Sequence, residues 1–163
     1  MTWDNDDDFN FEMSDEENEE YEREEKKKEE YRMNHPITKQ GEEVYRTVRA
    51  LVESISDEGA RNSYGSILME SAMIIPAKIA GAFGSESWLL MMQNAAIIRS
   101  HAEYLLTATS GMKYEEMADL RYVQLMREEM TRFRTVFVEW VKEIHQMEEE
   151  EYVDEWGLFI RKA

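Results

Sequence analysis

The sequence predicts an all-α protein: an antiparallel up-down four-helix bundle with a disordered acidic N-terminal arm. Three observations support this fold class. Apolar residues recur at helical spacing in four segments between residues 36 and 147. Glycine or proline residues interrupt the chain around these segments. Charge is concentrated at the ends, since residues 1–35 hold fifteen acids and five bases, whereas residues 36–147 hold fifteen acids and twelve bases.

The arm is expected to cover residues 1–35. Its charged run, 15–30, would bury too little apolar surface to offset the conformational entropy lost on folding, so we predict disorder. Glutamate–lysine pairs favour a transient helix within 19–32. Aromatic residues among the aspartates resemble a short linear element that binds a partner, with incidental apolar residues in a tail as the alternative. These residues are Trp3, Phe9 and Phe11.

Four helices are expected between residues 36 and 147. The first covers 38–56 and the second 61–82, where Pro76 should kink the helix because proline removes a backbone donor. The third, 86–109, is apolar almost all round. The fourth, 114–147, carries a heptad seam, which is typical of near-parallel helix packing. The seam consists of Val123, Met126, Met130, Phe133, Phe137, Trp140, Ile144 and Met147.

The apolar composition of the third helix also predicts self-association of the protein. Every helix of a four-helix bundle has an outer side, so a helix that is apolar on two faces is typical of a subunit interface. Small residues around Pro76 would let a neighbouring backbone come close. We therefore expect a homo-oligomer whose interface includes Pro76, Trp88, Met91, Met92 and Ala95. Residues 148–163 are expected to form an acidic and then apolar tail that packs back on the bundle.

No catalytic, cofactor-binding or metal-binding residues are predicted. The chain has no cysteine, no Gly-x-Ser-x-Gly nucleophile motif and no Glu-x-x-His pair of the kind that holds iron in helical bundles. His101, on an apolar helix, is expected to be a packing or interface residue. The arginines of the fourth helix do not appear as one stripe, which favours solvated or ion-paired side chains over a nucleic-acid patch. We expect a protein that is not an enzyme and has no cofactor.

The net charge of −17 limits the classes of partner that we expect this protein to bind. It argues against nucleic-acid binding, which needs lysine and arginine to displace phosphate counterions, and against an anionic membrane surface. It favours a basic protein partner. The N-terminal sequence has no signal-peptide pattern, and the apolar stretches are interrupted before they reach the length of a membrane span. These features predict a cytoplasmic protein with no membrane partner.

The segment Ile75–Gly84, IPAKIAGAFG, resembles the I-P-A-N-I-A-E-G-x-G segment of the four-helix-bundle proteins encoded in ribosomal-RNA intervening sequences. The resemblance covers roughly residues 38–147, because an aromatic and aliphatic helix and a closing helix follow. It implies a ring-shaped homo-oligomer, such as a pentamer. One branch of that family is the accessory protein of diversity-generating retroelements, which assists a reverse transcriptase and RNA.

Two functions remain as hypotheses. The leading one is a non-enzymatic, homo-oligomeric module for protein interaction or assembly. The alternative, implied by the resemblance, is an accessory factor that binds RNA or single-stranded DNA, which the charge of the chain disfavours.

Overall fold

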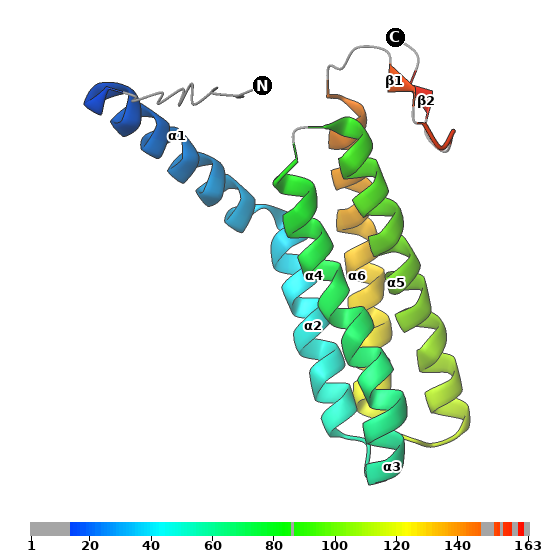
Figure 1. The fold of residues 1–163 in the computed structure, drawn as a ribbon. Helices are drawn as coiled ribbons and strands as arrows, with labels where there is room; N and C mark the ends of the chain where they lie inside the picture. The colour runs from blue at the N-terminus through cyan, green and yellow to red at the C-terminus, as the bar shows by residue number, and fades with distance from the viewer. Residues whose placement is uncertain (1–13, 86, 148–151, 154, 158–159, 162–163) are drawn as a thin grey trace, which may run out of the picture. The chain divides into compact units, whose positions relative to one another are not determined.

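The computed structural model describes residues 14–85, 87–147, 152–153, 155–157 and 160–161. The chain divides into two compact units, Met1–Tyr31 and Arg32–Ala163. The described residues form an all-α fold, apart from two strands of two residues each (Figure 1).

The N-terminal unit contains most of α1, Asp15–Asn34. This helix corrects the prediction of disorder for these residues. Ser14 and Glu17 form a capping box, in which the Ser14 backbone N–H donates to the Glu17 carboxylate at 2.9 Å. Ion pairs Glu19–Arg23 and Glu25–Lys28 follow along the helix. None of its residues is buried, so local capping and ion pairs, rather than a core, account for the helix.

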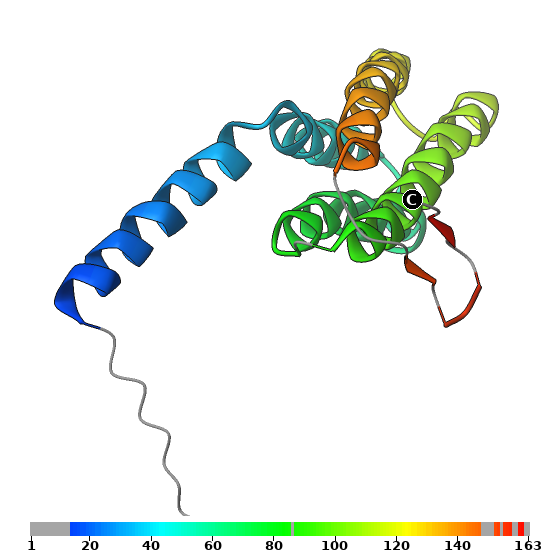
Figure 2. The same cartoon turned by 90° about the horizontal axis from the view of Figure 1, so that it is seen from above.

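The second unit contains four long helices: α2 (Pro36–Glu53), α4 (Ser66–Phe83), α5 (Trp88–Tyr114) and α6 (Leu120–His145). α2 packs against α4 and α6, and α5 packs against the same two helices, as Figure 2 shows from above. Each helix therefore has two neighbours among the four, and the apolar core lies between them.

The predicted seam of α6 faces this core. Val123, Met126, Met130, Phe133, Trp140 and Ile144 are buried, and Phe137 and Met147 are half-buried. The Trp140 ring lies 5.8 Å from the ring of Phe137 and 6.2 Å from that of Phe83, measured between centroids. Trp140 thereby joins α6 to the end of α4.

α2 and α4 approach closely at two glycines. A methyl group on Gly41 would lie 2.7 Å from Ile79 Cδ1 and 3.8 Å from the Cα atom of Pro76. A methyl group on Gly65 would lie 2.8 Å from Val52 Cγ1. Pro76 is therefore approached closely by a helix of the same chain.

The segment before α4 differs from the single helix predicted over 61–82. It consists of the short helix α3 (Glu58–Ala60) and a π-helical turn, Arg61–Gly65. The side chain of Asp57 caps α3 by accepting a hydrogen bond from the Ala60 N–H at 2.7 Å. The helical segment thus starts earlier than predicted, and it contains a wide turn where Gly65 meets α2.

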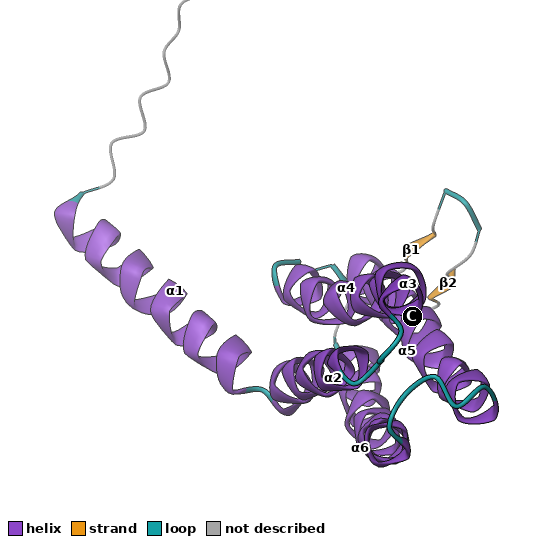
Figure 3. Ribbon diagram, turned by 90° about the horizontal axis from the view of Figure 1, so that it is seen from below, coloured by secondary structure: helices purple, strands orange, loops and turns teal. Residues whose placement is uncertain are grey.

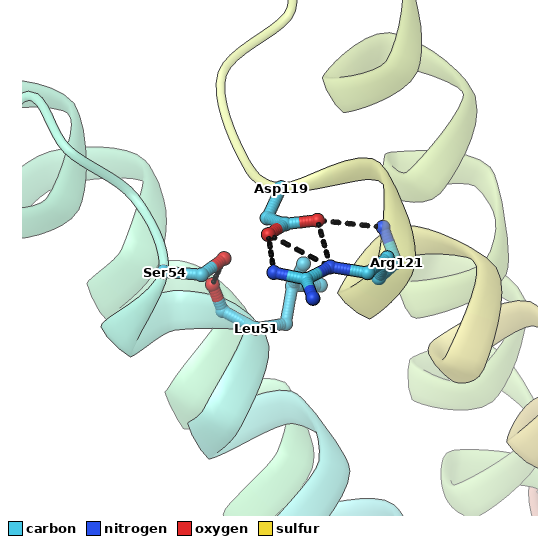
Figure 4. A network of polar contacts seen from close by, with 4 residues as sticks. All are labelled: Leu51, Ser54, Asp119 and Arg121. Atoms are coloured by element: carbon cyan, nitrogen blue, oxygen red, sulfur yellow. Dashed lines mark hydrogen bonds and ion pairs between the residues drawn. The ribbon is translucent and has the colours of Figure 1, made fainter.

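The link between α5 and α6 explains why α6 starts later than the predicted residue 114. α5 itself extends to Tyr114, and the chain turns at Glu116, which has a φ of 53°. Asp119 then caps α6: its carboxylate accepts hydrogen bonds from the Arg121 N–H at 2.9 Å and from Arg121 Nη2 at 2.6 Å (Figure 4). Figure 3 shows this loop from below. These hydrogen bonds from the Arg121 side chain and backbone lower the pKa of Asp119 to about 2.

The C-terminal tail forms a small hairpin that the sequence did not suggest. β1 (Tyr152–Val153) pairs antiparallel with β2 (Ile160–Arg161), and Gly157 between them has a φ of +66°. Trp156 is 84% exposed. The packing predicted for the rest of residues 148–163 rests mainly on positions outside the described residues.

The buried ring of Trp140 gives a test of the core. We expect Trp140→Ala to lower the free energy of unfolding by about 3–5 kcal/mol, because the substitution removes apolar burial and leaves a cavity. Tyr114→Ala is the matched control, since Tyr114 is 88% exposed and its loss should change stability by only about 0.5 kcal/mol. Urea unfolding followed by circular dichroism measures both. Equal losses in the two variants would contradict the assignment of Trp140 to the core.

The cap of α6 predicts a dependence on pH. The pKa of Asp119 is lower in the folded chain than its ordinary value of 3.8, so the charged carboxylate stabilises the fold above that value. This contribution is lost as the pH falls through about 4 towards about 2. Asp119→Asn keeps a capping oxygen but removes the charge. Urea unfolding should therefore show wild type to be the more stable near neutral pH, with the difference vanishing in acid. A difference that stays constant with pH would contradict the role of this charge.

Candidate functional site

The structure places most of the predicted interface inside the chain. Trp88, Met91 and Ala95 are only 4%, 8% and 3% exposed. Their burial is intramolecular and assigns them to the core, which corrects the prediction that they lie on a free outer face. Met92 and Pro76 are half-buried, and Pro76 faces the close approach of Gly41.

Other apolar residues of these two helices are exposed. α4 carries only two charged side chains, Glu70 and Lys78. We define the α4–α5 face as Ile67 and Ile74 of α4 with Leu90, Ile97 and Tyr104 of α5. Four of these side chains are exposed, and Ile74 is half-buried. Ile67 is 48% exposed.

Helical spacing puts the members of this face in two stripes. Positions 67, 71, 74, 78 and 81 follow one side of α4, and 90, 94, 97, 101 and 104 follow one side of α5. Two contacts join the stripes. His101 Nδ1 lies 3.2 Å from Ser71 Oγ, and a methyl group on Gly81 would lie 3.7 Å from Asn94 Oδ1. The two stripes therefore form one continuous surface, with the half-buried His101 at its centre.

The helical run that contains α4 is long and apolar enough to qualify as a membrane span, by length and composition alone. The continuous helical run Glu58–Phe83 is long and apolar enough, and only a third of its most apolar window is buried. This corrects the statement that no stretch reaches the length of a span. The buried side chains of this run lie in the core, and its other apolar side chains lie on the exposed surface. The buried members of α4 are Leu68, Ser71, Ala72, Ile75, Ile79 and Ala82.

A second surface runs between α5 and α6. One hollow of about 260 Å³ is lined by Arg99, Ala102, Glu103, Leu106, Met130, Phe133, Arg134, Phe137 and Val138. Another, of about 500 Å³, is lined by Ser110, Lys113, Leu120, Val123, Gln124 and Arg127. Both lie between the same two helices, on either side of the hydrogen bonds that Arg127 of α6 donates to Thr109 and Ser110 of α5, and together we call them the α5–α6 groove. Figure 3 shows these helices from below.

The groove has an excess of basic side chains. Arg99, Lys113, Arg127 and Arg134 line it against one acid, Glu103, whose carboxylate lies 3.1 Å from Arg99 Nε. Arg127 Nη1 donates instead to two hydroxyls, Thr109 Oγ1 at 2.8 Å and Ser110 Oγ at 3.2 Å. Among the described residues, no carboxylate pairs with Lys113, Arg127 or Arg134.

Sequence reasoning missed this groove. The arginines of the fourth helix were expected to be solvated or ion-paired, without a common stripe. Two of them, Arg127 and Arg134, are seven residues apart and line the same groove. The spacing of seven places both on one side of α6, but only the fold shows that α5 lies beside that side. Arg132, which does form an ion pair, bonds the buried Glu129 at 2.6 Å.

Other predicted sites are placed as follows. The arm residues Trp3, Phe9 and Phe11 lie outside the described residues. Within the part of the chain that the structure describes, no group of three or more histidine and acidic side chains is arranged to hold a metal ion. His35 lies 2.9 Å from the Glu143 carboxylate through Nε2, and this pair belongs to the packing of α2 against α6.

The fold and these surfaces define a class: an all-α helical protein with one exposed apolar face and one basic, apolar groove. No protein-family model matches the sequence, and no curated protein matches it.

The burial of Trp88 changes what its substitution should do. We expect Trp88→Ala to lower the free energy of unfolding by about 3–5 kcal/mol, because the ring belongs to the core of its own chain. Leu90→Ala, on the exposed side of the same helix, should change stability by less than about 1 kcal/mol. Urea unfolding measures stability, and light scattering measures particle mass. If Trp88→Ala lowered the mass while stability held, Trp88 would face a neighbouring subunit.

Proposed function

We propose that this protein is a non-enzymatic assembly protein, formed by copies of an antiparallel up-down four-helix bundle that associate through the α4–α5 face. The observation that supports it is the exposed apolar surface of α4 and α5 in a chain with 34% charged residues. Contiguous apolar patches on soluble proteins mark interaction sites. A second copy is the occupant that the chain itself supplies.

The up-down arrangement is supported by the connections. Short segments join the four long helices: residues 84–87 link α4 to α5, and residues 115–119 link α5 to α6. Short links of this kind favour antiparallel neighbours. α2 and α6, the first and last of the four, also pack against each other, which closes the arrangement.

The proposed assembly agrees with the resemblance to the intervening-sequence family. The segment that carries the resemblance, Ile75–Gly84, covers the second half of α4. Gly81 within it lies on the stripe of the α4–α5 face, where a side chain would find open space beyond Asn94. We propose family membership, and with it a ring-shaped oligomer, on this basis.

A charge placed on the face tests the assembly. We expect wild type to be oligomeric at micromolar concentration and Ile97→Glu to be monomeric, because burying an unpaired carboxylate in an interface is costly. Leu125→Glu on α6 is the matched control: Leu125 is 40% exposed, close to the 37% of Ile97, and lies outside the face. Sedimentation velocity measures particle mass, and circular dichroism verifies that helix content is unchanged.

Two results would contradict the proposal. A monomeric wild type would exclude self-association through any surface. Co-sedimentation with phospholipid vesicles that Ile97→Glu abolished, without a change in mass in solution, would assign the apolar face to a membrane instead of a second copy.

A further inference from the structure

We propose that the α5–α6 groove is a docking site for an acidic amphipathic helix of a partner protein. The groove is a different surface from the α4–α5 face. The proposal therefore stands whether or not the chain assembles through that face.

The floor of the groove fits apolar side chains. The half-buried Leu106 and Phe137 line it above the buried Met130 and Phe133, with Val138, 44% exposed, at its edge. The Phe133 and Phe137 rings are stacked, with centroids 6.0 Å apart. Methionine and aromatic side chains are typical of grooves that receive the apolar stripe of a helix.

The two sides of the groove carry the charge. Arg99 and Lys113 lie on the α5 side, and Arg127 and Arg134 on the α6 side. From Arg99 to Lys113 the helix rises by about 21 Å, which is the length of roughly four helical turns. A partner helix of that length would place its apolar residues on the floor and carboxylates against both rows of basic residues. Charge complementarity therefore favours an acidic helix.

Three of the four cations of the groove, Lys113, Arg127 and Arg134, have no carboxylate partner among the described residues, whereas Arg99 pairs with Glu103. Exposed arginines elsewhere bond carboxylates, as Arg46 does with Glu43 at 2.5 Å and Arg49 with Glu53 at 2.9 Å. Arg127 is held by hydroxyls, which position the guanidinium without neutralising it. The chain has thirty-six acidic and nineteen basic residues, so a groove lined by four bases and one acid has a locally reversed charge.

The same observations favour a peptide over a nucleic acid. The affinity of a nucleic acid depends on many phosphate contacts, which four basic side chains do not supply. A single helix is confined to the groove and presents carboxylates only where the basic residues lie. Its apolar side chains would also cover the floor.

The experiment uses the full chain and a fluorescein-labelled peptide with leucine at the a and d positions of the heptad and glutamate at the flanking positions. Fluorescence anisotropy at low salt should show binding to wild type, and Arg134→Glu should weaken it by about tenfold or more. Arg46→Glu, on α2 outside the groove, is the matched control and should retain the affinity within about twofold. Circular dichroism verifies that both variants are folded.

No binding of the acidic peptide to wild type would overturn the proposal, and so would four other results. The first is equal binding of the same peptide with lysine in place of glutamate. The second is binding of single-stranded oligothymidylate that Arg134→Glu abolishes, which would assign the groove to nucleic acid. The third is a loss of particle mass in Arg134→Glu, which would assign it to a second copy. The fourth is tighter peptide binding after removal of residues 1–13, which would assign it to the chain's own N-terminal segment.

Discussion

The contacts of Phe83 with Trp140 and with His35 are the constraint on which the rest of the helical unit depends. The Phe83 ring lies 6.2 Å from Trp140 and 5.1 Å from His35, so one aromatic series joins the end of α4, the last part of α6 and the start of α2. His35 also accepts a hydrogen bond from the Ile37 N–H through Nδ1, at 3.3 Å, which caps α2. With Nδ1 as acceptor, Nε2 carries the proton that it donates to Glu143. The ends of three helices are thereby held in register.

α5 lies between the two surfaces, and this position explains why its composition is so apolar. One side of this helix lies in the core, one flank contributes Leu90 and Ile97 to the α4–α5 face, and the other contributes Leu106 to the α5–α6 groove. A helix with three apolar surroundings has apolar residues almost all round. The pattern that predicted an interface was therefore informative, although it did not separate the core side from the exposed sides.

The heptad seam of α6 was predicted from sequence because periodic burial leaves a periodic pattern. Three other features left no such pattern. α1 depends on capping and ion pairs in a segment whose composition is that of a disordered chain. Trp88 could be assigned to the core only once the packing of α5 was known. The groove requires α5 and α6 side by side, so Arg99 and Arg134, far apart in the sequence, become neighbours only in the fold.

The π-helical turn at Arg61–Gly65 bears on how this chain tolerates changes of length. A turn with i→i+5 hydrogen bonds holds one more residue than an α-helical turn. Loss of one residue there would leave an ordinary α-helical turn, with α4 and every later element in its present register against the core. Only α3 and the preceding link would have to rotate. Elsewhere in α4, the same deletion would turn the buried side chains of the helix away from the core. The turn is thus the place in this long helical run where one residue can be removed without a change in the register of α4.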